Sequence, residues 1–89
     1  MSAEPELRRL VERWQQRPLD QALSRMPVVR PVVQGLADAV ADAEGRPHVV
    51  VPDLGPGVVM DQLTVMIHDA RDVEGLDIAG RLTRLRQRL

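Results

Sequence analysis

The sequence contains no cysteine, phenylalanine or tyrosine, and Trp14 is its only aromatic residue. Without cysteine there can be no disulfide framework, and nothing in the sequence argues for an oxidising compartment. The lack of further aromatic side chains leaves little on which nucleic-acid bases could stack. The core must therefore be built from aliphatic side chains and methionine. Trp14 is expected to be its one large residue or, alternatively, an anchor for a partner.

Long apolar runs are also missing. No window approaches the roughly 18 apolar residues needed to cross a bilayer. The first fourteen residues are charged throughout and lack the apolar core of an export signal. All 12 basic residues are arginine, and 13 acids bring the net charge to −1, so the chain as a whole has no excess charge for binding a polyanion. We expect a cytoplasmic protein without a membrane partner.

With 89 residues the chain has room for one small domain, covering residues 1–89. An aliphatic core in so short a chain, without disulfides or a metal, favours self-association or a protein partner over an isolated monomer. We therefore predict that the chain is not a free monomer in solution.

Helical periodicity covers the first half of the sequence. An amphipathic helix is predicted from Glu4 to Arg17, with a narrow apolar stripe that ends at Trp14. Pro18 and Pro27 bracket a short predicted helix, and an extended linker is expected over residues 28–30. That short helix places four apolar residues on one face: Leu19, Ala22, Leu23 and Met26.

A further helix is predicted to open at Pro31 and to close at Gly45, which suits the position after a helix C-terminus. Its apolar side carries Val33, Leu36, Ala37, Val40 and Ala41. Its polar side, expected to face solvent, carries Gln34, Asp38 and Asp42.

The central stretch changes character twice. Residues 48–51 are rich in valine and stop at Pro52, which favours an extended segment or a short strand. A turn rich in proline and glycine follows over residues 52–57. From there a helical apolar arc runs to residue 73, with Val58 and Val65 outside it. A hairpin across residues 48–60 is the alternative. The predicted class is thus mainly α, with four or five short helices and one extended segment near 48–51.

The last predicted helix, residues 77–89, carries the strongest candidate site. Asp77 is expected to cap this helix, which is treated as a segment that could detach from the rest of the domain. An apolar seam with coiled-coil-like spacing comprises Ile78, Leu82, Leu85 and Leu89. The arginines beside the seam are Arg81, Arg84, Arg86 and Arg88. Of these, Arg81, Arg84 and Arg88 are grouped with the seam as a partner-binding surface, because a narrow apolar seam needs another helix.

The other groups of polar residues are weaker candidates for a functional site. His68, Asp61 and Thr64 share one helical face, but a metal site would need more ligands than this spacing and the distant His48 provide. No nucleophile stands beside a base, so no catalytic set is predicted. The loop over residues 53–57 precedes a helix yet lacks the lysine of a phosphate-binding loop, and it is read as a local turn. No metal, cofactor or catalytic residue is expected.

Two functions follow from these patterns. The first is a non-enzymatic protein–protein interaction module, such as an adaptor, accessory subunit or regulator, that docks through amphipathic helices. The alternative is a small nucleic-acid-associated regulator that uses the arginine-rich C-terminal helix to contact phosphates. If leucines dominate binding, salt should matter little. If arginines dominate, binding should fall steeply with salt.

Overall fold

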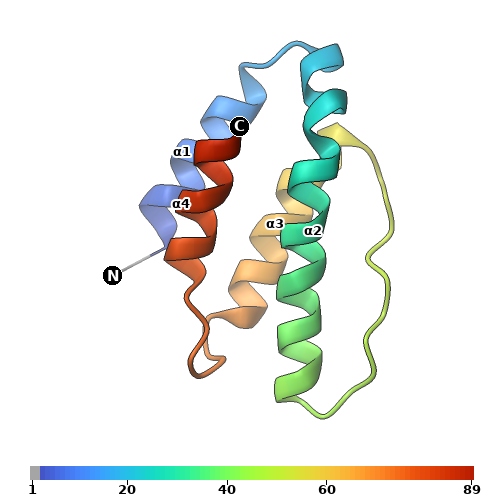
Figure 1. Ribbon diagram of the computed structural model, residues 1–89, viewed down its shortest axis with the longest axis vertical. Coiled ribbons are helices and arrows are strands. Elements are labelled where there is room, and N and C mark those ends of the chain that lie inside the picture. Colours follow the sequence, from blue (N-terminus) through green and yellow to red (C-terminus); the bar gives the residue numbers. More distant parts are fainter. Residues whose placement is uncertain (1–2) are drawn as a thin grey trace.

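The computed structural model describes residues 3–89, of which most are helical (Figure 1). The four helices are α1 (Glu4–Gln15), α2 (Leu19–Ala43), α3 (Pro56–Ala70) and α4 (Ile78–Arg88). The mainly α class is confirmed, and residues 3–89 contain no strand. The hairpin alternative is wrong, because Val58 to Met60 already belong to α3.

α2 differs from the sequence-based prediction, because it runs unbroken through Pro27 and Pro31. The predicted linker at residues 28–30 is therefore wrong. A proline inside a helix costs about 3 kcal/mol or more in lost hydrogen bonding and steric clash. Here the helix keeps Met26, Val29 and Val33 on one buried face, and Val29 is fully buried. Burying such side chains contributes about 1.5–3 kcal/mol each, which offsets the cost of the prolines.

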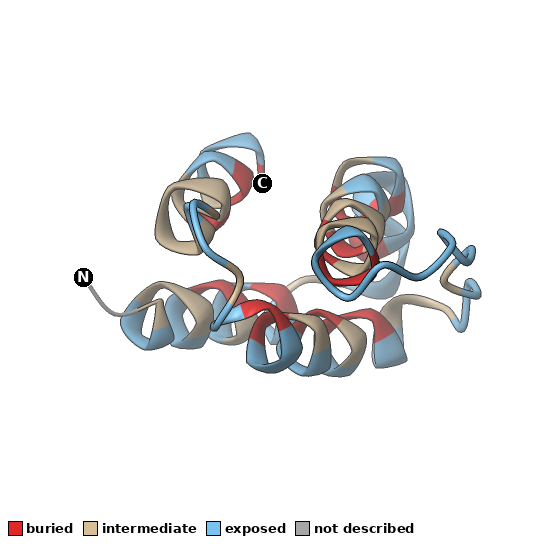
Figure 2. Cartoon of the chain, turned by 90° about the horizontal axis from the view of Figure 1, so that it is seen from below, coloured by how far each residue is buried: buried red, intermediate tan, exposed pale blue. Residues whose placement is uncertain are grey.

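The helices form two pairs around one core. α2 packs along α3, and α1 packs on α4, while α4 also touches α2. Seen from below, the buried residues lie on the faces turned toward the other helices (Figure 2). The fully buried large side chains are Leu10, Val29, Val33, Leu36, Val59, Leu63, Leu82 and Leu85. Val58 and Val65, which lie off the apolar arc in the sequence, are exposed in α3 as that pattern predicts.

Two helix ends lie where the sequence places them, whereas α1 and α3 end two and three residues before their predicted ends. Gly45 has a φ of 67° and follows the end of α2. Its N–H donates to the Asp42 carbonyl, and the Arg46 N–H donates to the Ala41 carbonyl at 2.8 Å, which is the Schellman arrangement. Asp77 caps α4, because its Oδ1 accepts from the Gly80 N–H at 2.9 Å. No helix in the described part of the chain is long and apolar enough to span a membrane.

Candidate functional site

The apolar seam of α4 lies inside the chain's own fold. Leu82, Leu85 and Leu89 are buried, and Ile78 is half-buried against the same core. α1 and α2 cover this face of α4. A partner could therefore reach these leucines only after α4 separated from α1, and detachment of the C-terminal helix stays a prediction.

The arginines of α4 have different surroundings. Arg84 and Arg88 are exposed. Arg81 is half-buried, with its guanidinium lying against α2 at Gly35. Arg86 donates through Nε to Glu6 of α1 at 3.0 Å, which ties the two helices together. Two of the three arginines grouped with the seam thus remain free to meet a partner's charge.

Trp14 belongs to the core. Its side chain is buried, and its indole Nε1–H donates to the carbonyl of Pro56 at 2.9 Å. A buried indole usually finds such an acceptor. Trp14 thereby joins the end of α1 to the first residue of α3, and it is not on the surface as an anchor in this conformation.

The feature that the sequence did not reveal is how the segment between α2 and α3 is held. Residues 46–55, here named the strap, run back along the outside of α2 without regular structure (Figure 1). Polar side chains at four-residue intervals on α2 fasten it: Arg30, Gln34, Asp38 and Asp42. Residues four apart lie next to one another on the surface of a helix, so the spacing makes a continuous row. The extended segment predicted near residues 48–51 is present, but side chains hold it in place of a strand.

Gln34 and Arg30 bind the backbone of the strap. The Gln34 side chain accepts from the Val51 N–H at 2.8 Å and donates to the Val49 carbonyl at 3.0 Å. Arg30 donates to the Val51 carbonyl at 3.3 Å and lies 3.8 Å from the Asp53 carboxylate. These contacts occupy one edge of the strap, while the valines at 49 and 50 remain exposed.

His48 clamps the other end of the strap. Its Nε2 lies 2.6 Å from the Asp42 carboxylate, and its Nδ1 lies 3.6 Å from that of Asp38. The hydrogen bond with Asp42 raises the pKa of His48 above its ordinary value of 6.5, and the charge of Asp38 adds to the shift. Asp38 and Asp42, which the sequence placed toward solvent, thus contact the strap.

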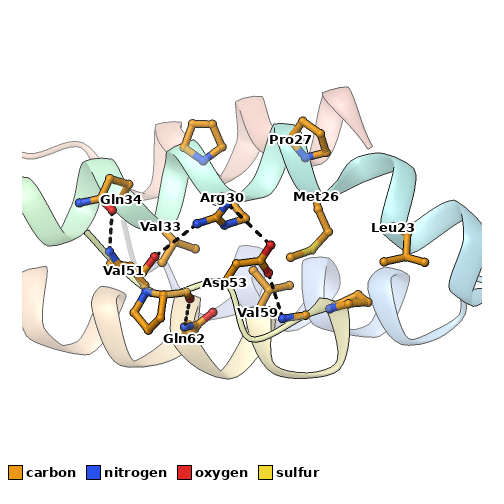
Figure 3. A pocket seen from close by; sticks show the side chains of 14 residues that line it. Leu23, Met26, Pro27, Arg30, Val33, Gln34, Val51, Asp53, Val59 and Gln62 are labelled. Carbon is orange, nitrogen blue, oxygen red and sulfur yellow. Dashed lines mark hydrogen bonds and ion pairs between the residues drawn. The ribbon is translucent and has the colours of Figure 1, made fainter. Parts of the chain in front are cut away.

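A groove with a volume of about 590 Å³ lies between α2, the strap and the start of α3 (Figure 3). Its buried apolar lining comes from Met26, Val33 and Val59, with Leu23 at one end. The polar residues that line it already have partners, since Arg30 and Gln34 bind the strap and Gln62 donates to the Pro52 carbonyl. The groove therefore suits an apolar side chain better than a polar substrate.

An exposed apolar row adjoins this groove. Leu19, Leu23, Pro27 and Pro31 follow at four-residue intervals on α2 and are all exposed; they are named here the α2 stripe. Leu19 is 68% exposed and Leu23 is 52% exposed. In the sequence both leucines share a helical face with Ala22 and Met26, but of these four residues only Ala22 and Met26 are buried. α3 packs along α2 and leaves the side with the two leucines uncovered.

A second cavity, of about 530 Å³, lies beneath the strap between α2 and α3. Its apolar lining includes Val40, Val65 and Met66. Among residues 3–89 no group of histidine, aspartate or glutamate side chains is placed to hold a metal ion. Comparison with protein-family models, curated proteins and solved structures finds no match to this chain.

Proposed function

We propose that the chain is a protein–protein interaction module whose docking surface is the α2 stripe together with the groove beside it. The observation that carries the proposal is the exposure of Leu19 and Leu23 next to a groove with a buried apolar floor. Covering an exposed leucine contributes about 1.5–3 kcal/mol. Apolar surface that adjoins a groove is typical of protein interaction sites.

The chemistry of the groove supports docking over catalysis. Its arginine and glutamines are engaged with the strap, so they hold the shape of the groove and leave an apolar surface. The proposal keeps the role expected from the sequence, docking through amphipathic helices, and moves the contact from α4 to α2. The leucines of α4 already pack inside the chain.

A second candidate function uses the arginines. Residues 3–30 and 78–89 carry ten arginines and four acids, whereas residues 31–77 carry two arginines and nine acids. Because α1 and α4 pack together, the basic segments are neighbours. A nucleic acid bound here would lose affinity as salt rises. Replacing Arg84 and Arg88 together by glutamine would then lower the salt slope by about two units, one for each lost phosphate contact.

Affinity capture with a matched pair of variants tests the proposed docking surface. Leu23 and Val65 have the same exposed fraction, 52%, but Val65 lies on α3 outside the stripe. Proteins that bind the wild-type chain in its native cell should be kept by Val65→Asp and lost by Leu23→Asp. Equal recovery with both variants, or no protein recovered reproducibly with the wild type, would overturn the proposal.

A further inference from the structure

We infer that the α2 stripe is a self-complementary surface on which a second copy of this chain docks, with the two α2 helices antiparallel. The inference rests on the proposed function and names the partner at the same surface. Its basis is an arrangement of apolar and charged groups on α2 that matches itself after a twofold rotation. Closed dimers of this kind use the same patch on both subunits.

The register follows from the positions of the stripe. Leu19 and Pro31 lie six residues on either side of position 25, and Leu23 and Pro27 lie two residues on either side. An antiparallel second helix centred there brings Leu23 of each copy against Pro27 of the other. Rows at four-residue spacing form ridges that pack at crossing angles of about −50°, so the closest contact falls at these central pairs. Arg25 itself lies about 180° from the centre of the stripe at 100° per residue and stays out of the contact.

Charges flank the stripe with the same symmetry. Asp20 and Arg30 lie five residues on either side of position 25, and at 100° per residue both fall within the arc of the stripe. Asp20 makes no ion pair within residues 3–89. Antiparallel docking brings Asp20 of each copy toward Arg30 of the other, whereas parallel docking would oppose like charges. The long guanidinium side chain, 41% exposed, has donors left beyond those used on the strap.

The groove supplies the complementary hollow. It opens along the same stretch of α2, between Leu23 and Gln34. In the antiparallel arrangement the exposed leucines of each copy come over the groove of the other. Pro27 and Pro31 assist the approach, because their short rings leave no long side chain between the helices. Each copy thus contributes both protruding leucines and a groove.

Cysteine cross-linking tests the register directly, because the chain has no cysteine of its own. A chain with Leu23→Cys is mixed with a second chain with Pro27→Cys under mild oxidation. The inference predicts a covalent dimer of the two different chains. Either variant alone should give little covalent dimer, because a residue of one copy and the same residue of the other copy lie at different levels along the two antiparallel helices. A mixture of Leu23→Cys with Val65→Cys is the control, and equal cross-linking in that control would overturn the inference.

Charge exchange between chains gives an independent test. Asp20→Arg alone and Arg30→Asp alone should each weaken self-association by about tenfold, because each opposes like charges at both ends of the stripe. Mixing these two variant chains restores both opposite-charge pairs, so the heterodimer should form in preference to either homodimer. Any loosening of the strap by Arg30→Asp is present both before and after mixing, so it cannot account for association that returns on mixing. Failure of mixing to restore association would contradict the inference.

Light scattering separates this inference from the proposed function. The wild-type chain and Val65→Asp should be dimeric at micromolar concentration. Leu23→Asp should raise the dimer Kd by more than about 100-fold, because the contact occurs twice. A wild-type chain that stays monomeric at millimolar concentration would overturn the second copy as occupant. The proposed function would still stand if Leu23→Asp also lost a different captured protein that Val65→Asp retained.

Discussion

The Oε1 atom of Gln34 accepts a hydrogen bond from the backbone N–H of Val51 at 2.8 Å. The same side-chain amide donates to the carbonyl of Val49, so one residue of α2 binds the strap as a neighbouring strand would. A lone extended segment leaves backbone groups that need partners. On this edge of the strap, a helix side chain supplies them.

The first prediction concerns this contact. Gln34→Leu should free the Val51 amide to exchange with solvent faster, and the loss of its two bonds to the strap should lower the free energy of unfolding by about 1–3 kcal/mol. Hydrogen exchange read at Val51 and chemical denaturation measure the two effects. Gln21→Leu is the matched control, since Gln21 is exposed on the same helix and its side chain does not hold the strap. Unchanged exchange at Val51 would show that the strap is fastened elsewhere.

The second prediction is a pH dependence at His48. Its pKa is raised in the folded chain by the Asp42 hydrogen bond, with Asp38 adding to the shift. Protonated His48 therefore stabilises the folded chain. This stabilisation is fully present below the pKa of His48 in the unfolded chain, near 6.5, and it is lost as the pH rises through the higher pKa in the folded chain. Exchange of the neighbouring strap amides, corrected for its intrinsic pH dependence, should be slower at acid pH. NMR titration should give a lower His48 pKa in Asp42→Asn, and an unchanged value would remove Asp42 as the cause.

The third prediction uses the buried seam of α4. Leu82 is fully buried, so Leu82→Ala should lower the free energy of unfolding by about 2–5 kcal/mol. Arg84→Ala, at an exposed position on the same helix, should change it by at most about 0.5 kcal/mol. Denaturant unfolding of both variants makes the comparison. If Leu82→Ala left the main transition unchanged, α4 would be the separable helix that the sequence suggests.

The fourth prediction compares two glycines. A Cβ at Gly80 would clash with Oδ2 of Asp77, whereas a Cβ at Gly57 meets nothing within 4 Å. Alanine favours a helix over glycine by about 1 kcal/mol. Gly57→Ala should therefore raise the melting temperature, while Gly80→Ala should lose the Asp77 cap, worth about 1 kcal/mol, and gain little or nothing. A larger gain from Gly80→Ala than from Gly57→Ala would contradict the observed cap.

Short-range chemistry made the helix ends predictable. Gly45 and Asp77 act within a few residues of their own position, so the sequence alone identifies a helix end and a cap. The course of α2 through Pro27 could not be predicted in this way. The helix continues there because residues distant in the sequence bury Val29, and the local helix propensity of the sequence does not include the free energy of that burial.

The candidate surface was harder to predict for the same reason. Leu19 and Leu23 occur at helical spacing with Met26, and only the packing of α2 in the folded chain decides which of them face inward. The row from Arg30 to Asp42 did carry a signal, because polar residues recur every fourth position. Without knowing that an extended segment lies on that face, the pattern reads as a solvated surface.

The way in which α2 holds the strap determines which positions of the sequence can change without loss of these contacts. Gln34 and Arg30 bind backbone atoms of the strap, so replacements at positions 49 and 50 leave these bonds intact. The spacing along α2 has no such freedom. One residue inserted between positions 34 and 38 would rotate half of the row by about 100° and turn Asp38 and Asp42 away from His48. Related chains should therefore vary at positions 49 and 50 while keeping the length of α2.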